Sequence, residues 1–219
     1  MALESAVVRP HSLIFTQGKD TDMTGMLNWK GGVFALVLLG LNGCGINNIP
    51  TYDEAVKGAW SQVLNQYQRR ADLVPNLVET VKGYAAHEKD TLTAVTEARA
   101  KVGQMQIPKD ILTNPAAFKA FQSHQTELSG ALSRLMVVAE QYPNLKADQN
   151  FLSLQSQLEG TENRIAVARK DYIESVQRYN TEIRTFPGRI WRAIMYSDAE
   201  VKENFTVAES AKEAPKVKF

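Results

Sequence analysis

The chain has 219 residues, of which 25 are Lys or Arg and 24 are Asp or Glu, so its formal net charge is +1. This near-neutral balance argues against a nucleic-acid-binding domain, which normally carries a strongly basic face. A single Cys excludes an internal disulfide framework and a zinc site built from several cysteines. With 44% hydrophobic and 22% charged residues, the composition is typical of one folded domain with appendages.

An apolar run over residues 31–41 predicts a signal peptide or membrane anchor over 23–43. The 11 residues of the run would span roughly 17 Å as a helix, which is short of a hydrocarbon core of about 30 Å. Lys30 precedes the run and small residues follow it, an order typical of an export signal. The run ends in Leu-Asn-Gly-Cys, which resembles a lipobox and predicts lipid attachment at Cys44. An uncleaved N-terminal membrane anchor is the alternative interpretation.

Residues 1–22 fit neither interpretation, because they would place an acidic extension ahead of the apolar run. We predict that this segment is disordered or results from a misassigned start codon. Met23 or Met26 would then begin a conventional signal.

The distribution of basic residues predicts which side of the membrane the body occupies. Lys30 precedes the apolar run, and no further basic residue occurs until Lys57, so the N-terminus should lie inside. The body would then face the periplasm or exterior of a bacterial cell, next to a short tether over 44–50. Gly45 directly after Cys44 would favour the outer membrane in a Gram-negative host.

The remaining chain shows the periodicity of amphipathic helices. Thr51 and Glu54 form a capping box that opens a first helix, predicted over 51–84. Pro75 lies inside this helix and should kink or restart it, because proline cannot donate to the carbonyl four residues back. A second helix is predicted over 88–105. The first helix carries a seam of residues at steps of three and four: Val56, Trp60, Val63, Tyr67, Arg70, Val74, Leu77, Val81 and Tyr84.

Two further long helices complete the pattern. The third has Asn114 as N-cap and Pro115 in the first helical position, and the fourth is predicted over 148–184. The seam of the third helix contains Phe118, Phe121, Gln125, Leu128, Leu132, Leu135, Ala139 and Tyr142.

The predicted fold class is all-α, since no window shows the alternation of a β-strand. Helices joined by short connections predict a long antiparallel up-down four-helix bundle over 51–187. A short C-terminal helical segment is predicted over 188–205, followed by a disordered tail over 206–219.

Two polar clusters interrupt the seams and form the candidate functional site. Arg70 lies on an otherwise apolar seam, where an unpaired charge is strongly disfavoured, so we expect it to meet Glu159 or Glu162 across a helix interface. These residues either fix helix order and alignment, or form a site for a ligand or partner between helices. The candidate inter-helix polar network comprises Arg69, Arg70, Asp72, Asn76, Glu159, Glu162, Asn163 and Arg164.

The histidines do not form a recognisable catalytic or metal-binding motif. His87 is followed by Glu88, but Thr91 stands where a zinc-protease motif requires its second His. His124 and Glu127 reverse the Glu-x-x-His order of di-iron bundles. We therefore expect no enzymatic activity, no cofactor and no metal ion.

Four stretches of the chain resemble the LemA family closely and in the same order. They read AWSQVLNQYQRRADLVPNLVETVKGY over 59–84, YPNLKA over 142–147, LEGTENRIA over 158–166 and YNTEIRTFP over 179–187. The resemblance implies a bacterial envelope protein with an N-terminal membrane anchor and a long antiparallel helical bundle. The family has no established enzymatic activity and is linked in general terms to membrane organisation, and one branch takes part in magnetosome formation.

Together, these features favour a membrane-tethered helical scaffold that binds another envelope protein or a second copy of itself. An enzyme or small-ligand receptor that uses the inter-helix polar site is one alternative. Direct remodelling of the membrane surface through residues 190–194 is another, because Trp191 and Arg192 suit an interface. No nucleic-acid partner is expected.

Overall fold

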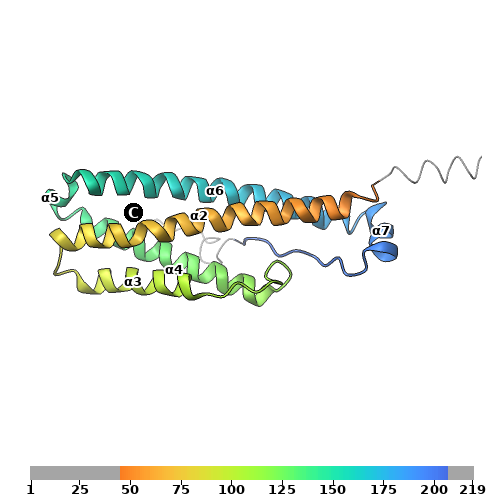
Figure 1. Ribbon diagram of the computed structural model, residues 1–219, viewed down its shortest axis with the longest axis horizontal. Helices are drawn as coiled ribbons and strands as arrows, with labels where there is room; N and C mark the ends of the chain where they lie inside the picture. Colours follow the sequence, from red (N-terminus) through yellow and green to blue (C-terminus); the bar gives the residue numbers. More distant parts are fainter. Residues whose placement is uncertain (1–44, 207–219) are drawn as a thin grey trace, which may run out of the picture. The chain divides into compact units, whose positions relative to one another are not determined.

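The computed structural model describes residues 45–206, in which all regular secondary structure is helical (Figure 1). The predicted all-α class is therefore confirmed for this range. The predictions for residues 1–43, for Cys44 and for 207–219 lie outside the described residues. The helices are α2 (Asn48–Tyr84), α3 (Lys89–Gln104), α4 (Pro115–Ala139), α5 (Pro143–Lys146), α6 (Gln149–Glu182) and α7 (Gly188–Met195).

The two longest helices, α2 and α6, lie side by side in opposite directions (Figure 1). Their 37 and 34 residues correspond to lengths of about 55 and 51 Å. A hydrogen bond joins the pair at each end. At one end Asn48 Nδ2 donates to Glu182 Oε1 at 3.2 Å, and at the other the Tyr84 hydroxyl donates to Asp148 Oδ2 at 2.9 Å.

Helices α3 and α4 form a second antiparallel pair, and α3 also packs against α2. Lys101 of α3 pairs with Glu127 of α4 at 2.6 Å. The Tyr142 hydroxyl, beyond the end of α4, donates to Glu88 at the start of α3 at 2.9 Å. The short helix α5 then connects α4 to α6 and was not predicted as a separate element. Pro143 opens it directly after the turn that follows α4.

The predicted capping box at the start of the first helix is wrong, because α2 begins at Asn48. Pro50 is tolerated there, since backbone N–H groups in a first turn need no helical acceptor. The Thr51 N–H already donates to the Asn47 carbonyl at 3.1 Å and needs no side-chain cap. The Glu54 carboxylate instead accepts from Lys57 at 2.6 Å.

Pro75 does not divide the first helix, so of the two predicted outcomes, a kink or a restart, the restart is wrong. Helix α2 continues through Pro75, although this residue cannot donate to the carbonyl of Ala71. Val74 and Leu77 on either side are buried in a common hydrophobic cluster with residues of α3, α4 and α6. Tertiary packing therefore holds the helix together where its local propensity is weakest.

Two predicted helix starts are confirmed by their caps. Asn114 Oδ1 accepts a hydrogen bond from the Ala117 N–H at 3.1 Å, with Pro115 in the first helical position. Asp148 Oδ1 accepts from the Phe151 N–H at 2.9 Å at the start of α6. Each cap satisfies one of the backbone donors that a helix leaves free at its N-terminus.

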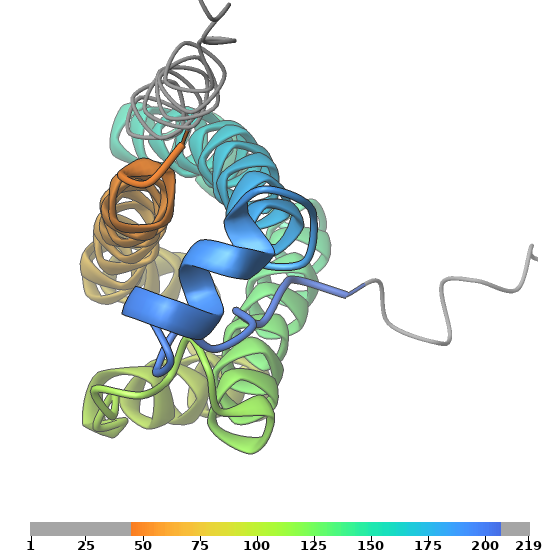
Figure 2. The ribbon, with the colours of Figure 1, turned by 90° about the vertical axis from the view of Figure 1, so that its right-hand side faces the viewer.

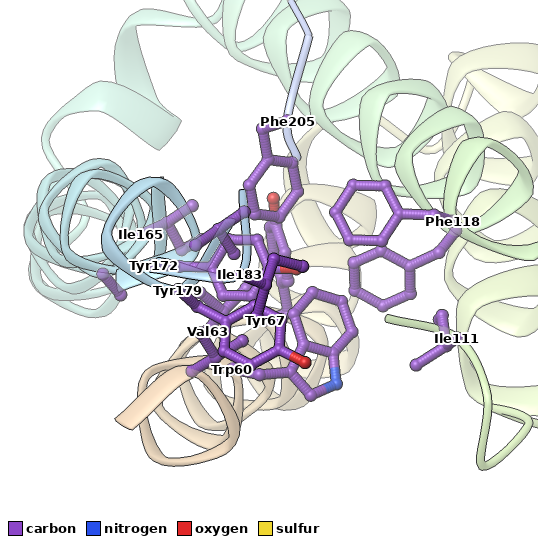
Figure 3. Close-up of a cluster of buried hydrophobic side chains, with 14 of the residues drawn as sticks. Trp60, Val63, Tyr67, Ile111, Phe118, Ile165, Tyr172, Tyr179, Ile183 and Phe205 are labelled. Atoms are coloured by element: carbon purple, nitrogen blue, oxygen red, sulfur yellow. The ribbon is translucent and has the colours of Figure 1, made fainter. Parts of the chain in front are cut away.

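One half of the core is rich in aromatic side chains (Figure 3). Trp60 of α2 lies 5.0 Å from Phe121 of α4 and 5.4 Å from Tyr172 of α6, measured between ring centroids. Such tilted ring pairs add to the stabilisation from apolar burial. The other half is mainly aliphatic and contains residues of α2, α3, α4, α5 and α6.

The C-terminal segment is helical over α7 and irregular beyond it, which differs from the continuous helical segment predicted over 188–205. Residues 201–206, here called the C-terminal strap, have no regular secondary structure. The strap runs between α4 and α6, where Phe205 lies 5.1 Å from Phe118 and 5.4 Å from Tyr172. The strap needs no regular secondary structure, because other elements satisfy its backbone. Tyr172 donates to the Glu203 carbonyl, and the Glu203 N–H donates to the Leu112 carbonyl, both at 2.7 Å.

Candidate functional site: a buried arginine between three helices

Arg70 lies at the centre of the candidate site, and only 1% of its surface is exposed. Its position follows from the seam of α2, on which Tyr67 and Val74 are also buried. Because residues three and four apart share one face of a helix, the same periodicity that buries these neighbours directs Arg70 inward. A buried guanidinium stays charged, so the surrounding helices must supply acceptors.

Helices α4 and α6 supply those acceptors. Arg70 Nη1 donates to Ser129 Oγ at 2.6 Å and to Glu162 Oε1 at 2.9 Å. Arg70 Nη2 donates to the backbone carbonyl of Gln125 at 3.1 Å and to its side-chain Oε1 at 2.7 Å. Four of the five N–H groups are thus used within the protein, and Nε has no hydrogen-bond partner. We call Arg70, Gln125, Ser129 and Glu162 the arginine network.

The electrostatic environment of Arg70 is asymmetric. Its guanidinium carbon lies 5.0 Å from the centre of the Tyr67 ring, a favourable cation–π distance. Burial raises the pKa of Tyr67, and the positive charges of Arg169 and Arg70 offset part of that rise. The carboxylate partner Glu162 keeps 42% of its side chain exposed, so only the cation of this ion pair is fully removed from water.

The predicted pairing of Arg70 with Glu159 or Glu162 is confirmed, with Glu162 as the partner. Glu159 lies one turn away on α6 and instead accepts from Gln155 at 3.1 Å. Six of the eight residues of the predicted network are exposed and form no hydrogen bond with Arg70. They are Arg69, Asp72, Asn76, Glu159, Asn163 and Arg164. The periodicity of each helix places them on outward faces, so the cluster is much smaller than predicted.

Sequence reasoning missed two members of the arginine network, Gln125 and Ser129 of α4. Gln125 interrupts the apolar seam of its own helix, as Arg70 does on α2, and this shared irregularity is the signal that could have paired them. Ser129 carries no such signal, because a small hydroxyl residue at a half-buried position is common in any helix. Thr161 is a polar residue on the buried face of α6, and its hydroxyl donates to the Gln157 carbonyl of the same helix at 2.7 Å.

A shallow groove between α2 and α6 is lined by two residues of the predicted network, Asn163 and Arg164. Its volume is about 340 Å³. Gln66 also lines it, and the Oε1 atom of this side chain is buried without a hydrogen-bond partner. Neither Arg70 nor Glu162 lines this groove, so it is separate from the arginine network.

Within residues 45–206, no group of three His, Cys, Asp or Glu side chains is placed to bind a metal ion. His124 Nδ1 lies 3.9 Å from Glu127 Oε2, and Glu127 also pairs with Lys101. Over the same range, none of the helices combines the length and the apolarity needed to cross a bilayer.

These features define a class of long helical proteins in which a buried polar cluster ties three helices together. The sequence profile of the LemA family matches residues 59–219, and the chain belongs to that family. Protein LemA of Metamycoplasma hominis is 26% identical over 155 residues, which cover 71% of this chain and 65% of that protein. Magnetosome proteins MamQ 1 and MamQ 2 of Paramagnetospirillum magneticum are each 26% identical over 157 residues, which cover 64% of this chain and 58% of theirs. The matched region thus spans less than two thirds of these relatives.

Proposed function

We propose that the protein is a non-enzymatic helical scaffold of the bacterial cell envelope, anchored to a membrane through its N-terminal segment. Its body would be an antiparallel up-down four-helix bundle facing the periplasm or exterior, which binds an envelope protein or a second copy of itself. The observation that carries the proposal is the arginine network. Arg70 is the one fully buried cation among residues 45–206, and the protein's own side chains accept its hydrogen bonds.

The arrangement of the network favours a structural role over a binding site for a ligand. A ligand that approached Arg70 would have to displace Glu162, Ser129 or Gln125, each of which already lies within hydrogen-bond distance. Buried charged groups of this kind can fix the alignment of helices, because any shifted arrangement leaves the charge unpaired. A fixed alignment is what a scaffold needs in order to present its outer faces reproducibly.

Helix α2 begins at Asn48, only four residues after Cys44, which limits how far the described helices could lie from an N-terminal anchor. Even a fully extended connection of four residues spans only about 14 Å. A lipid on Cys44, or an anchor over the apolar run, would therefore keep the start of α2 close to the bilayer. The names of the MamQ relatives, which describe them as magnetosome proteins, are consistent with a role in an organised assembly.

Fractionation of bacterial cells that express the full chain tests the anchoring. We expect the protein to sediment with membranes and to resist extraction with alkaline carbonate. If Cys44 is lipidated, Cys44→Ser should move the protein to the soluble fraction. If the anchor is uncleaved, Cys44→Ser should stay in the membrane at the size of the precursor. Recovery of the unmodified full chain in the soluble fraction would overturn the proposal.

Photo-crosslinking in intact cells tests the scaffold role. Photoreactive residues would replace exposed Arg69 on α2, Lys119 on α4 and Arg178 on α6 in separate variants. A scaffold should give an adduct of constant size, with an envelope protein or a second copy, from at least one face. The absence of adducts from all three faces would argue against a scaffold role.

A further inference from the structure

Four large apolar side chains are exposed within one short segment, residues 186–195, near one end of the described helices. Phe186 follows α6, and Ile190, Ile194 and Met195 belong to α7. The exposed fractions of Phe186 and Ile194 reach 78% and 71%. Single exposed apolar residues are ordinary on protein surfaces, but a group of this size marks a surface that contacts something. We call these four residues the α7 patch.

The geometry of α7 explains why the patch is exposed. Ile190 and Ile194 are four residues apart and therefore share one face of the helix. Trp191, on the adjoining face, packs against the aromatic half of the core. Arg192 Nε donates to the Ala199 carbonyl at 2.8 Å, which ties the polar face to the chain that follows. Helix α7 lies across one end of the described helices (Figure 2). Trp191 and Arg192 hold it there, while Ile190 and Ile194 remain exposed.

The start of α2 lies at the same end as the α7 patch. Asn48 bonds to Glu182 at the C-terminal end of α6. A Cβ atom on Gly45 would lie 3.6 Å from the Pro187 side chain, which directly follows Phe186. The chain therefore enters the described region next to the patch, and Cys44 is covalently bonded to Gly45. Residue 41, at the end of the apolar run, is at most about 14 Å of extended chain from Gly45.

We propose that the α7 patch inserts into the interfacial region of the same bilayer that holds the N-terminal segment. The inference rests on the anchoring proposed above, but it holds equally for a lipidated Cys44 and for an uncleaved anchor, since both bring lipid to Gly45. An amphipathic helix with exposed isoleucines on one side and arginines on the other is suited to lie in a membrane interface. Insertion of the patch costs little additional entropy, because the anchor already holds these residues near the lipid.

Charge has a secondary role in this contact. Arg184 and Arg189 are exposed beside the patch and would approach lipid phosphates favourably. Asp198 and Glu200 are also exposed shortly after α7, so the local charge is mixed. The contact therefore depends on burial of the apolar side chains, and we expect it to persist in vesicles without anionic lipid.

Lipid photo-crosslinking tests the inference on the full chain. A diazirine amino acid would replace Ile194 in one variant and Val137 in a matched control, in vesicles of phosphatidylethanolamine and phosphatidylglycerol. Val137 is exposed to 60%, and it lies in the last turn of α4, near α5 and away from α7 (Figure 1). We expect lipid adducts at position 194 and only background at position 137.

Two outcomes would overturn the inference while leaving the anchoring intact. One is equal or absent lipid labelling at positions 194 and 137 in a chain that still sediments with the vesicles. The other is an adduct at position 194 with a second copy of the chain in place of lipid, which would assign the patch to self-association. A chain that fails to sediment would overturn the anchoring and, with it, this inference.

Discussion

Arg70 shows how one polar residue on an apolar seam constrains a helical protein. Its four hydrogen bonds reach two other helices, so the observed alignment of α2, α4 and α6 supplies acceptors for four of the five guanidinium N–H groups. Apolar side chains alone would tolerate several alignments with similar burial. We therefore infer that the buried cation contributes more to the uniqueness of the fold than to its total stability.

We expect Glu162→Ala to destabilise the protein by about 1–3 kcal/mol, because it leaves a buried N–H donor of Arg70 without its charged partner. The partial exposure of Glu162 places the effect toward the lower part of that range. Urea unfolding followed by circular dichroism measures the change. Glu159→Ala is the matched control on the same helix and should stay within about 0.5 kcal/mol of the unmodified protein. Equal effects of the two substitutions would contradict a special role for Glu162.

Asp53 provides a second residue whose charge matters, near the start of α2. Burial by itself raises the Asp53 pKa. The hydrogen bonds and charges of Lys202 and Lys57, whose Nζ atoms each lie 2.8 Å from an Asp53 carboxylate oxygen, lower the pKa by more, so it lies below its ordinary value. A lowered pKa in the folded state contributes stability that is present above the unfolded pKa of about 3.9. That contribution is lost as the pH falls through the folded pKa.

Asp53→Asn should therefore lower stability by about 1–2 kcal/mol at neutral pH, because it removes the charge that the two lysines bind. The difference from the unmodified protein should start to shrink as the pH falls below about 4, and it should vanish below the lowered pKa of folded Asp53, where that carboxylate is neutral. Urea unfolding at a series of pH values measures this difference. Glu54→Gln serves as the control, since Glu54 is exposed and pairs only with Lys57. A pH-independent difference for Asp53→Asn would show that the charge is not responsible.

At the level of single residues, the sequence predicts that Arg70 has a carboxylate partner, but it does not predict which residue that partner is. Arg70 could be assigned a carboxylate partner because a charge on a seam must be neutralised. The choice of Glu162 over Glu159 depends on the rotation of α6, which the polar residue Thr161 on the buried face of that helix leaves ambiguous in the sequence. Ser129 could not be predicted, since its role depends on the distance between α2 and α4.

The helices themselves were predictable, because their seams extend over many turns and their caps have a local signature. Asn114 and Asp148 accept backbone hydrogen bonds within their own first turns, so no tertiary information is required. The C-terminal strap is the opposite case. Its backbone partners are remote in sequence, so no local pattern could distinguish it from a continuation of α7. They are Leu112, Gln122, Tyr172 and Asn180.

The strap should be essential to the aromatic half of the core. We expect Phe205→Ala to cost about 3 kcal/mol, because Phe205 is largely buried among Trp60, Phe118 and Tyr172 and its removal leaves a cavity. Hydrogen exchange should report faster exchange of the Glu203 amide, which donates to the Leu112 carbonyl. Val201→Ala, at an exposed position of the same strap, is the control and should change neither quantity. Unchanged exchange in Phe205→Ala would indicate that the ring does not hold the strap.

For the whole protein, the two ends of the described helices differ, because the N-terminal segment connects to only one of them. The start of α2 and the α7 patch share the first end, whereas α5 lies at the other (Figure 1). Helix α6 separates the two ends by about 51 Å. This separation could not be assigned from the sequence, because the exposure of the α7 patch depends on how α7 packs through Trp191.

If the anchor and the α7 patch both contact one bilayer, α5 should be held away from the membrane. A fluorescent amino acid at Ser197, just after α7, should transfer energy efficiently to an acceptor lipid in the same vesicles. The same fluorophore at Lys146 in α5 should transfer much less, because α6 separates α5 from the membrane end. Both side chains are exposed, so the label should not disturb the core.

Loss of the patch should weaken this orientation without releasing the protein. In Ile190→Ser with Ile194→Ser, only the short connection to the anchor would restrain the helices, and they could tilt toward the lipid. Transfer from position 146 should then rise, while sedimentation with vesicles stays unchanged. Similar transfer from positions 146 and 197 in the unmodified background would show that the helices already lie along the membrane. In that case the long faces of α2 and α6, and not the end that bears α7, would be the surface closest to lipid.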